Sequence, residues 1–294
     1  MSNIRHFIQR HPVLCYYVLT FVISWGGILA IVGGFGGIPV TMEEADKLLL
    51  PVMLALFAGP SIGGLVMTGL VYGKDGFPNL LLRMTRWRVN IGWYAVALLS
   101  APILFLVVTL ILSATSRQFL PGIIVSKDVP SLLVFGISYG LIGGGLLEEL
   151  GWTGFAIPAI RLRHNVIRTA LIVGFLWGAW HFMVIYWMSD PNGEVPVWLL
   201  LPIQLFSWLP AYRILMVWVY ERTGGSLFIA MLMHASLSAS MLILQPQGLA
   251  GKALLTFILA FSAALWLVVL VISIAKRRKL YARNDKSASK IISH

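Results

Sequence analysis

Charged side chains are scarce in this chain. They make up 11% of its 294 residues, whereas soluble domains carry about 25%, so the composition excludes an ordinary soluble protein. Hydrophobic residues make up 59%, and the mean hydropathy is +0.86. Cysteine is almost absent as well. Cys15 stands alone, which excludes an internal disulfide and gives no basis for redox chemistry.

Long apolar runs occupy most of the chain. A helix needs about 20 apolar residues to cross about 30 Å of hydrocarbon, and eight runs are of this order. They cover residues 13–35, 51–73, 91–114, 131–155, 167–188, 197–220, 225–244 and 252–275. Backbone groups in lipid must pair within their own helix. We therefore expect an all-α polytopic membrane protein, with residues 1–294 forming a single bundle of about eight transmembrane helices.

The positive charge is unevenly distributed. The chain has a net charge of +11, and most lysines and arginines lie at the N-terminus, in alternate loops and in the tail at 276–294. This positive-inside pattern predicts that both termini face the cytoplasm, in a plasma membrane for which we expect a bacterial source. It also argues against a nucleic-acid partner. The basic tail is predicted to be disordered and to bind anionic lipid headgroups.

Four acidic or histidine side chains fall inside the apolar runs: Glu148, Glu149, His181 and His234. Such groups cost at least ~2.5 kcal/mol each in a bilayer and usually mark function. At 1.5 Å per residue from the expected cytoplasmic ends, Glu148 lies at a depth of about 15 Å, His181 about 20 Å and His234 about 13 Å. Each histidine alone could be a helix-to-helix hydrogen bonder. Their common depth instead favours one shared site.

Hydrolysis is the reaction that suits this set. Adjacent carboxylates point about 100° apart on a helix, so one of Glu148 and Glu149 can face a cavity while a partner holds the other. A glutamate with a histidine can deprotonate water. A second histidine with a hydroxyl can stabilise an oxyanion, and His234 and Ser238 lie four residues apart on one helix face. We expect cleavage of an acyl bond, a peptide bond above all, within the membrane.

A zinc site is the alternative at the same residues. Glu148, His181 and His234 are a ligand set found in hydrolytic zinc sites, although the H-E-x-x-H pattern is absent. The residues leave metal dependence open, and we favour water activation without a metal or other cofactor.

Three segments resemble the motifs of the CAAX-protease and bacteriocin-processing family, also called Abi or CPBP intramembrane proteases. They are EELGWTGFAIP, FLWGAWHF and GGSLFIAMLMHASLSAS, and the family pattern is E-E-x-x-x-R, F-x-x-x-H and H-x-x-x-N. The resemblance covers residues 130–245. It implies an eight-helix bundle whose site lies in a cavity open toward the cytoplasm, and an endopeptidase acting on a membrane peptide or protein.

Carried over by position, the resemblance implies that Glu148 and His181 activate the water. It implies that His234 and the residue four positions later, Ser238, form the oxyanion site, and that Glu149 is an orienting acid. This chain departs from the pattern at three positions: Thr153 stands for arginine, Trp177 for phenylalanine and Ser238 for asparagine.

Thr153 leaves Glu149 without its expected cation. The sixth run contains one arginine, Arg213, about 10 Å from its cytoplasmic end, which is close to the depth of Glu149. An unpaired buried carboxylate would destabilise the bundle. We therefore predict that Arg213 pairs with Glu149 and that Thr153 adds a hydroxyl. The alternative is that Arg213 extends to the headgroups.

Two other functions fit the same polar residues. A family member that has lost activity could act as an immunity or binding protein in the membrane. A proton-coupled transporter also uses buried Glu and His side chains, although no inverted repeat is visible in the hydropathy. Both remain alternatives to the protease.

Overall fold

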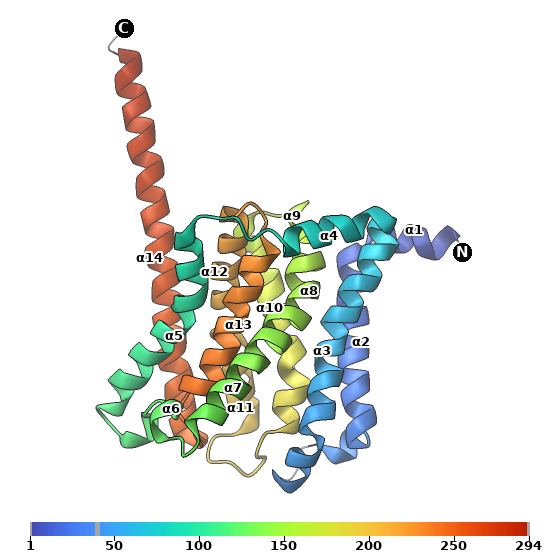
Figure 1. Cartoon of the computed structure of the whole chain (residues 1–294), viewed down its shortest axis with the longest axis vertical. Coiled ribbons are helices and arrows are strands. Elements are labelled where there is room, and N and C mark those ends of the chain that lie inside the picture. Colours follow the sequence, from blue (N-terminus) through green and yellow to red (C-terminus); the bar gives the residue numbers. More distant parts are fainter. Residues whose placement is uncertain (1, 39–41, 293–294) are drawn as a thin grey trace.

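The computed structural model describes residues 2–38 and 42–292, and the regular elements in those ranges are all helices (Figure 1). Eight helical runs are long and apolar enough to cross a membrane: Pro12–Val32, Lys47–Met84, Ile91–Ser113, Val129–Arg161, Val166–Trp187, Val197–Arg222, Leu227–Leu244 and Gly251–Ala275. These runs overlap the eight predicted spans, so the predicted fold class is confirmed. The protein is a multi-pass membrane protein.

The longer helices are α1 (Ser2–Arg10), α2 (Pro12–Val32), α3 (Met42–Tyr72), α4 (Gly76–Met84), α5 (Ile91–Ser113), α10 (Val166–Trp187), α11 (Val197–Phe206), α12 (Leu209–Arg222), α13 (Leu227–Leu244) and α14 (Gly251–Ile292). The seventh span, α13, lies at the centre of the bundle, packed against α5, α7 (Val129–Tyr139) and α12. The outer spans α2 and α3 pack along each other. His234 therefore lies on a helix with neighbours on several sides.

The fourth span is not a plain α-helix. After α7 it forms a π-helix, η4 (Gly140–Glu148), a short α-helical turn, α8 (Glu149–Gly151), a second π-helix, η5 (Trp152–Ala156), and then α9 (Ile157–Arg161). Glycines let this span approach its neighbouring helices closely. A Cβ on Gly143 would lie 2.8 Å from the ring of Phe57 in α3, and one on Gly144 would collide with Ser238 in α13. Both glutamates sit where one π-helix ends, a position often used for functional sites.

The sixth span is interrupted in its middle. It consists of α11 and α12, with Pro210 in the first turn of α12, a position where proline starts a new helix without loss. The break fits against a glycine of α10, because a Cβ on Gly174 would lie 2.6 Å from the Cα of Pro210 and 3.3 Å from the Cβ of Arg213. This close approach turns the first part of α12 toward the interior.

Side-chain caps set where α10 and α13 begin. Asn165 accepts a hydrogen bond from the backbone N–H of Arg168 (2.9 Å), and Ser226 accepts one from that of Ile229 (3.2 Å). Asn and Ser are among the residues preferred at this position. Because each helix rises 1.5 Å per residue, the two caps fix the depths of His181 and His234.

One end of the bundle carries both chain termini together with α4 and α9 (Figure 1), and these are the segments that hold most of the basic residues. There α4 lies across the end of the fourth span. Arg83 donates to the carbonyl oxygens of Thr153 (3.3 Å) and Gly154 (2.7 Å). These bonds satisfy carbonyl groups of η5. We call this end the basic end.

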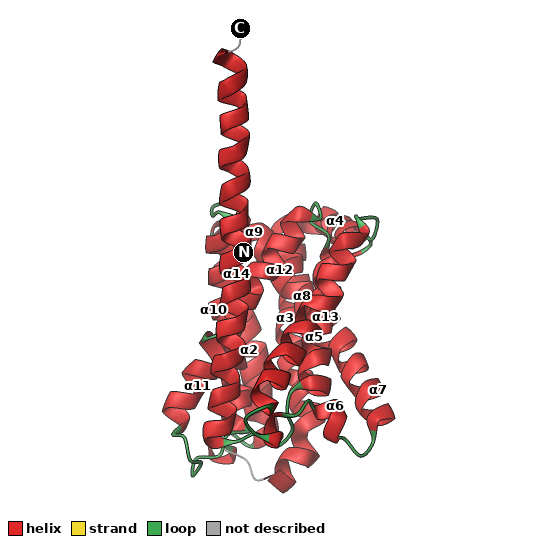
Figure 2. Ribbon diagram, turned by 90° about the vertical axis from the view of Figure 1, so that its left-hand side faces the viewer, coloured by secondary structure: helices red, strands yellow, loops and turns green. Residues whose placement is uncertain are grey.

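The C-terminal segment differs from the sequence expectation. The backbone of α14 continues as a helix to Ile292 and projects beyond the bundle (Figure 2), where we predicted disorder from residue 276. The segment from 276 to 292 has no glycine or proline, so nothing in it ends a helix. The side chains of 276–294, and with them the predicted lipid contacts of the tail, lie outside the described residues.

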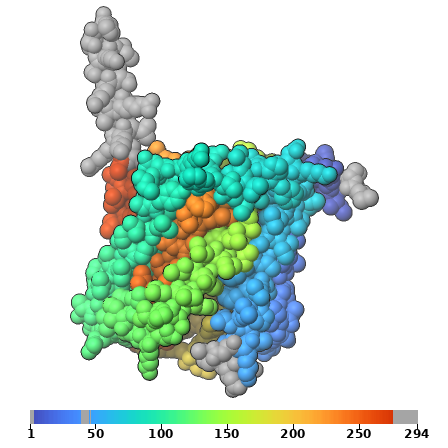
Figure 3. All heavy atoms as spheres, viewed as in Figure 1, coloured from blue at the N-terminus to red at the C-terminus, as the bar shows by residue number. Residues whose placement is uncertain are grey.

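Large apolar side chains cover the outside of the bundle. Ile103 on α5 is 55% exposed and Leu267 on α14 is 60% exposed, as expected of helices that face lipid. In Figure 3, α13 shows at the surface between α5 and the segment formed by α7 and η4. The outer faces of these helices are therefore largely apolar.

The contact between α3 and α8 gives a test of this packing. A Cβ on Gly151 would collide with the carbonyl oxygen of Pro60 and the hydroxyl of Tyr16. We expect Gly151→Ala to lower the free energy of unfolding by about 1–3 kcal/mol, measured by thermal unfolding in detergent. Gly26→Ala on α2 is the control, since a Cβ there meets nothing within 4 Å. An equal effect of both variants would contradict the close approach.

Candidate active site

Glu149 is completely enclosed and has three polar partners. Its Oε1 accepts from Nη1 of Arg213 at 2.8 Å and from Nδ1 of His234 at 2.7 Å. Its Oε2 accepts from the hydroxyl of Thr153, four residues along the same span. Glu149 and Arg213 are both 0% exposed. A buried carboxylate is tolerated only when it is paired in this way.

Arg213 therefore lies inside the bundle, where the sequence analysis placed it, and not at the headgroups. Its guanidinium also stacks over the indole of Trp177, 4.2 Å from the ring centroid, a cation–π contact that is favourable in a desolvated site. The break before α12 and the glycine at 174 bring it there. Arg213 thus bridges the second glutamate and α10.

Glu148 is held by different partners. Its Oε2 accepts two indole hydrogen bonds, from Nε1 of Trp177 at 2.7 Å and from Nε1 of Trp152 at 3.1 Å. Its Oε1 lies 3.9 Å from Nε2 of His234 and accepts no hydrogen bond from the described residues. The side chain is 5% exposed. One oxygen of Glu148 is thus fixed, and the other is left open.

The imidazole of His234 stands between the two carboxylates. Nδ1 faces Glu149 and Nε2 faces Glu148. A carboxylate only accepts hydrogen bonds, so the short contact to Glu149 requires a proton on Nδ1. Ser238 lies one turn further along α13, and its Oγ and Nε2 of His234 both pack against Gly144. The two α13 side chains that we predicted to act together therefore face one surface of η4.

His181 contacts this cluster through Trp177. Its Nδ1 bonds to the carbonyl oxygen of Trp177 at 2.8 Å, and its ring packs edge-on against the indole of Trp177 at 5.5 Å. It makes no direct bond to Glu148 or His234 in the described part of the chain. His181 lines a cavity of about 100 Å³ together with Gln204 and Gln245. The structure therefore links His181 to the glutamates through Trp177.

Cavities lie on both sides of the site. The resemblance implied an opening toward the cytoplasm. At the basic end, α4 covers η5, with Leu80 against Gly154, and a cavity of about 460 Å³ is lined in part by Arg83 and Gly154. The cavity at His181 and a larger one of about 680 Å³, lined in part by Gly143 and Leu147, lie in the opposite half of the bundle.

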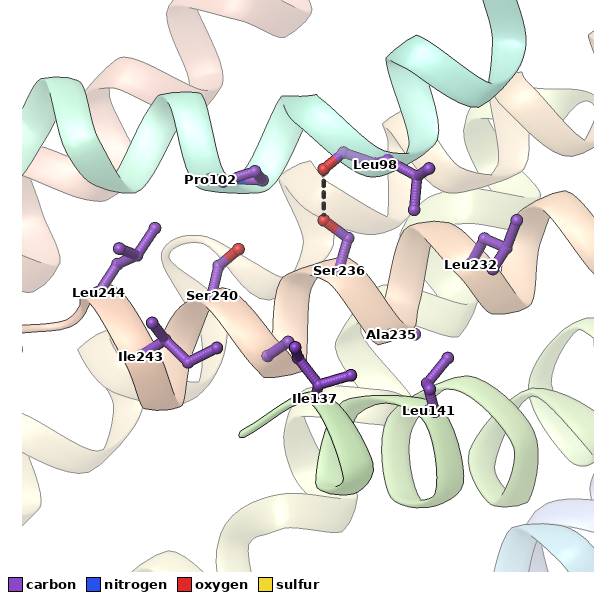
Figure 4. A pocket seen from close by; sticks show the side chains of 11 residues that line it. Leu98, Pro102, Ile137, Leu141, Leu232, Ala235, Ser236, Ser240, Ile243 and Leu244 are labelled. Atoms are coloured by element: carbon purple, nitrogen blue, oxygen red, sulfur yellow. Dashed lines mark hydrogen bonds between the residues drawn. The ribbon is translucent and has the colours of Figure 1, made fainter. Parts of the chain in front are cut away.

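A further groove on the outer surface is not part of the site. Figure 4 shows this groove of about 320 Å³ between α5, α13 and the segment formed by α7 and η4. Its lining is apolar apart from Ser236, which donates to the carbonyl of Leu98 (2.8 Å), and Ser240. A lipid chain suits such a lining better than a polar reactant.

The zinc alternative has little geometric support. Within residues 2–38 and 42–292, no three His, Cys, Asp or Glu side chains are arranged to hold a metal ion. Glu148 and His234 approach each other, and His181 makes no direct bond to either in the described part of the chain.

Comparison with known proteins agrees with the geometry. Residues 129–240 match the family described as type II CAAX prenyl endopeptidase Rce1-like. The chain is also similar to CAAX prenyl protease 2 of Methanococcus maripaludis, with 25% identity over 229 residues, which are 74% of this chain and 80% of that protein. The matched segment contains both glutamates and both histidines. Both matches support the resemblance of this chain to the CAAX-protease and bacteriocin-processing family.

The structure accounts for two of the three departures from the pattern of this intramembrane protease family. Arg213 supplies, from another span, the cation that Thr153 does not provide. Trp177, in place of phenylalanine, gives Glu148 a hydrogen-bond donor that phenylalanine lacks. Ser238 keeps one hydroxyl donor where the family has an amide.

Sequence analysis missed the two tryptophans that hold Glu148. The signal was present, because Trp152 follows Glu148 by four residues and Trp177 precedes His181 by four, and residues at this spacing are neighbours on a helix. These indoles do more than fill the core, because a buried indole N–H needs an acceptor.

A double-mutant cycle tests the buried pair. Glu149→Gln and Arg213→Gln should each lower the free energy of unfolding by about 3–5 kcal/mol, because each leaves a buried charge unpaired. The double variant should lose clearly less than the sum. The same cycle on Arg161 and Glu221, an ion pair at 2.7 Å with side chains 29% and 33% exposed, is the control, with coupling below about 1 kcal/mol. Additive losses at 149 and 213 would refute the pairing.

Proposed function

We propose that this chain is an intramembrane endopeptidase that cleaves a peptide bond with water activated by Glu148. The observation that carries the proposal is the unequal treatment of two adjacent carboxylates. Glu149 is engaged through both oxygens by Arg213, His234 and Thr153. Glu148 is held through Oε2 alone. Its Oε1 is therefore available as a general base.

The attack on the substrate uses Glu148 and His181. Oε1 of Glu148 takes a proton from a water molecule as the water oxygen bonds to the peptide carbonyl carbon. The contact of Nδ1 of His181 with a carbonyl oxygen requires a proton on that nitrogen, so Nε2 of the neutral ring is an acceptor. It can orient the second hydrogen of the water. Glu148 then passes its proton to the leaving amine as the C–N bond breaks.

His234 and Ser238 stabilise the oxyanion. Once Nε2 of His234 has taken up a proton from solvent water, its N–H donates to the carbonyl oxygen as negative charge develops there. Glu149 accepts from Nδ1 at 2.7 Å and stabilises this charged form, which is the usual role of a carboxylate behind a histidine. The hydroxyl of Ser238 supplies a second donor. The positive charge of Arg213 faces the same carboxylate at 2.8 Å.

The substrate we propose is a membrane-associated peptide or protein. The name of the Methanococcus maripaludis relative refers to a prenyl protease, so a prenylated C-terminal peptide is a reasonable first probe, with the same peptide lacking the prenyl group beside it. We further propose that the basic end faces the cytoplasm of a plasma membrane, because lysine and arginine concentrate in the loops and termini at that end.

Replacement of the general base tests the proposal. Glu148→Gln keeps the size and an acceptor for both indoles but removes the base, so we expect kcat to fall by about 10²- to 10⁴-fold with unfolding temperature nearly unchanged. Turnover of the peptides in detergent is the measurement. Glu194→Gln is the matched control, since Glu194 pairs with Lys252 on the surface. A Glu148→Gln variant with wild-type turnover would contradict the assignment. A wild-type protein that binds peptides without cutting them would favour the immunity or binding alternative.

Metal removal separates the two hydrolytic mechanisms. We expect 1,10-phenanthroline to leave turnover nearly intact and elemental analysis to find well under one metal ion per chain. Stoichiometric zinc with activity lost on chelation and restored by zinc would move the assignment to a metalloprotease using Glu148, His181 and His234.

A further inference from the structure

Trp177 contacts more of the candidate site than any residue to which a role has been given above. Its indole N–H bonds to Glu148 (2.7 Å), and its carbonyl oxygen bonds to His181 (2.8 Å). One face of its ring carries the guanidinium of Arg213 at 4.2 Å. The imidazole of His234 meets the ring edge-on, with centroids 5.1 Å apart. The side chain is 2% exposed, so all of these contacts are sheltered from water.

The indole bond determines which oxygen of Glu148 is free. Trp177 and Trp152 both donate to Oε2, from two different helices. Rotation of the carboxylate would break two buried hydrogen bonds at once, and a buried indole N–H left without an acceptor is costly. Oε1 therefore keeps its orientation toward Nε2 of His234, 3.9 Å away.

We propose that Trp177 is a positioning residue for Glu148, whose indole N–H holds the carboxylate so that Oε1 is presented to the reacting water. This inference rests on the proposed function. It goes beyond the family pattern, in which phenylalanine occupies this position and offers a ring without a donor. Phenylalanine at this position would only pack, whereas Trp177 packs and also donates a charge-assisted hydrogen bond to Glu148.

The position of Trp177 depends on the same ion pair that holds Glu149. Arg213 bonds to Glu149 and covers the face of the indole, so the two carboxylates are connected through one guanidinium and one indole. Phenylalanine at 177 would keep the ring face for Arg213 and the backbone carbonyl for His181. The substitution Trp177→Phe therefore removes little besides the N–H group and the outer part of the ring.

The experiment compares Trp177→Phe with wild type in the peptide assay. Loss of a hydrogen bond to a charged group should lower kcat by about 10-fold or more, while KM stays within about twofold, because the indole N–H does not touch the substrate. Trp25→Phe is the matched control. It removes an indole N–H that donates to the carbonyl of Trp180 on α10 at 3.0 Å, away from Glu148, and should leave kcat unchanged.

A spectroscopic readout measures the carboxylate directly. The infrared carboxylate band that disappears in Glu148→Gln should shift in Trp177→Phe and stay in place in Trp25→Phe. If Trp177→Phe does not fold, Trp152→Phe removes the other donor to the same oxygen and should shift the same band and lower kcat in the same direction.

The outcomes separate this inference from the proposed function. A wild-type protein that cuts none of the peptides overturns the function and this inference with it. If the wild type cuts a peptide and Trp177→Phe has the same kcat, with or without a changed KM, the positioning role alone is overturned. Lower kcat, unchanged KM and a shifted band in Trp177→Phe, with none of these in Trp25→Phe, support it.

Discussion

A buried ion pair between Glu149 and Arg213 is the interaction on which the centre of this bundle depends. Two charges are removed from water there, at a cost that only close pairing offsets. Oε1 of Glu149 is 2.8 Å from Nη1 of Arg213. The same oxygen orients His234, and the same guanidinium covers the indole of Trp177. The pair therefore fixes the relative positions of the fourth, fifth, sixth and seventh spans where the polar side chains meet.

The pair also explains why two adjacent glutamates occur in an apolar span. Each has its own surroundings: a cation, an imidazole and a hydroxyl for Glu149, and two indole N–H groups for Glu148. The partners of Glu149 neutralise its charge, and the two indoles orient the carboxylate of Glu148. Only the second arrangement leaves an oxygen free for chemistry, so a structural and a reactive carboxylate can follow each other along one helix.

Much of this arrangement could be predicted from the sequence, and the limits have physical causes. Hydropathy predicted the eight spans because a membrane helix must bury its own backbone. Charge balance predicted the contact of Arg213 with Glu149, since few cations lie at that depth. The π-helices of the fourth span, the packing of α4 across the basic end and the cavity lined by His181 were not predicted. They depend on how several helices pack together, and one-dimensional periodicity carries no such information. Composition likewise did not show that α14 continues as a helix to Ile292.

The central claim is that Glu149 is the paired carboxylate and Glu148 the oriented one. An experimental density map that resolves both side chains tests it most directly. The account predicts that Glu149 contacts Arg213 at about 2.8 Å and that Glu148 accepts from the indoles of Trp152 and Trp177. A map with Arg213 directed to the headgroup region, or with Glu148 rather than Glu149 bound to it, would contradict the account.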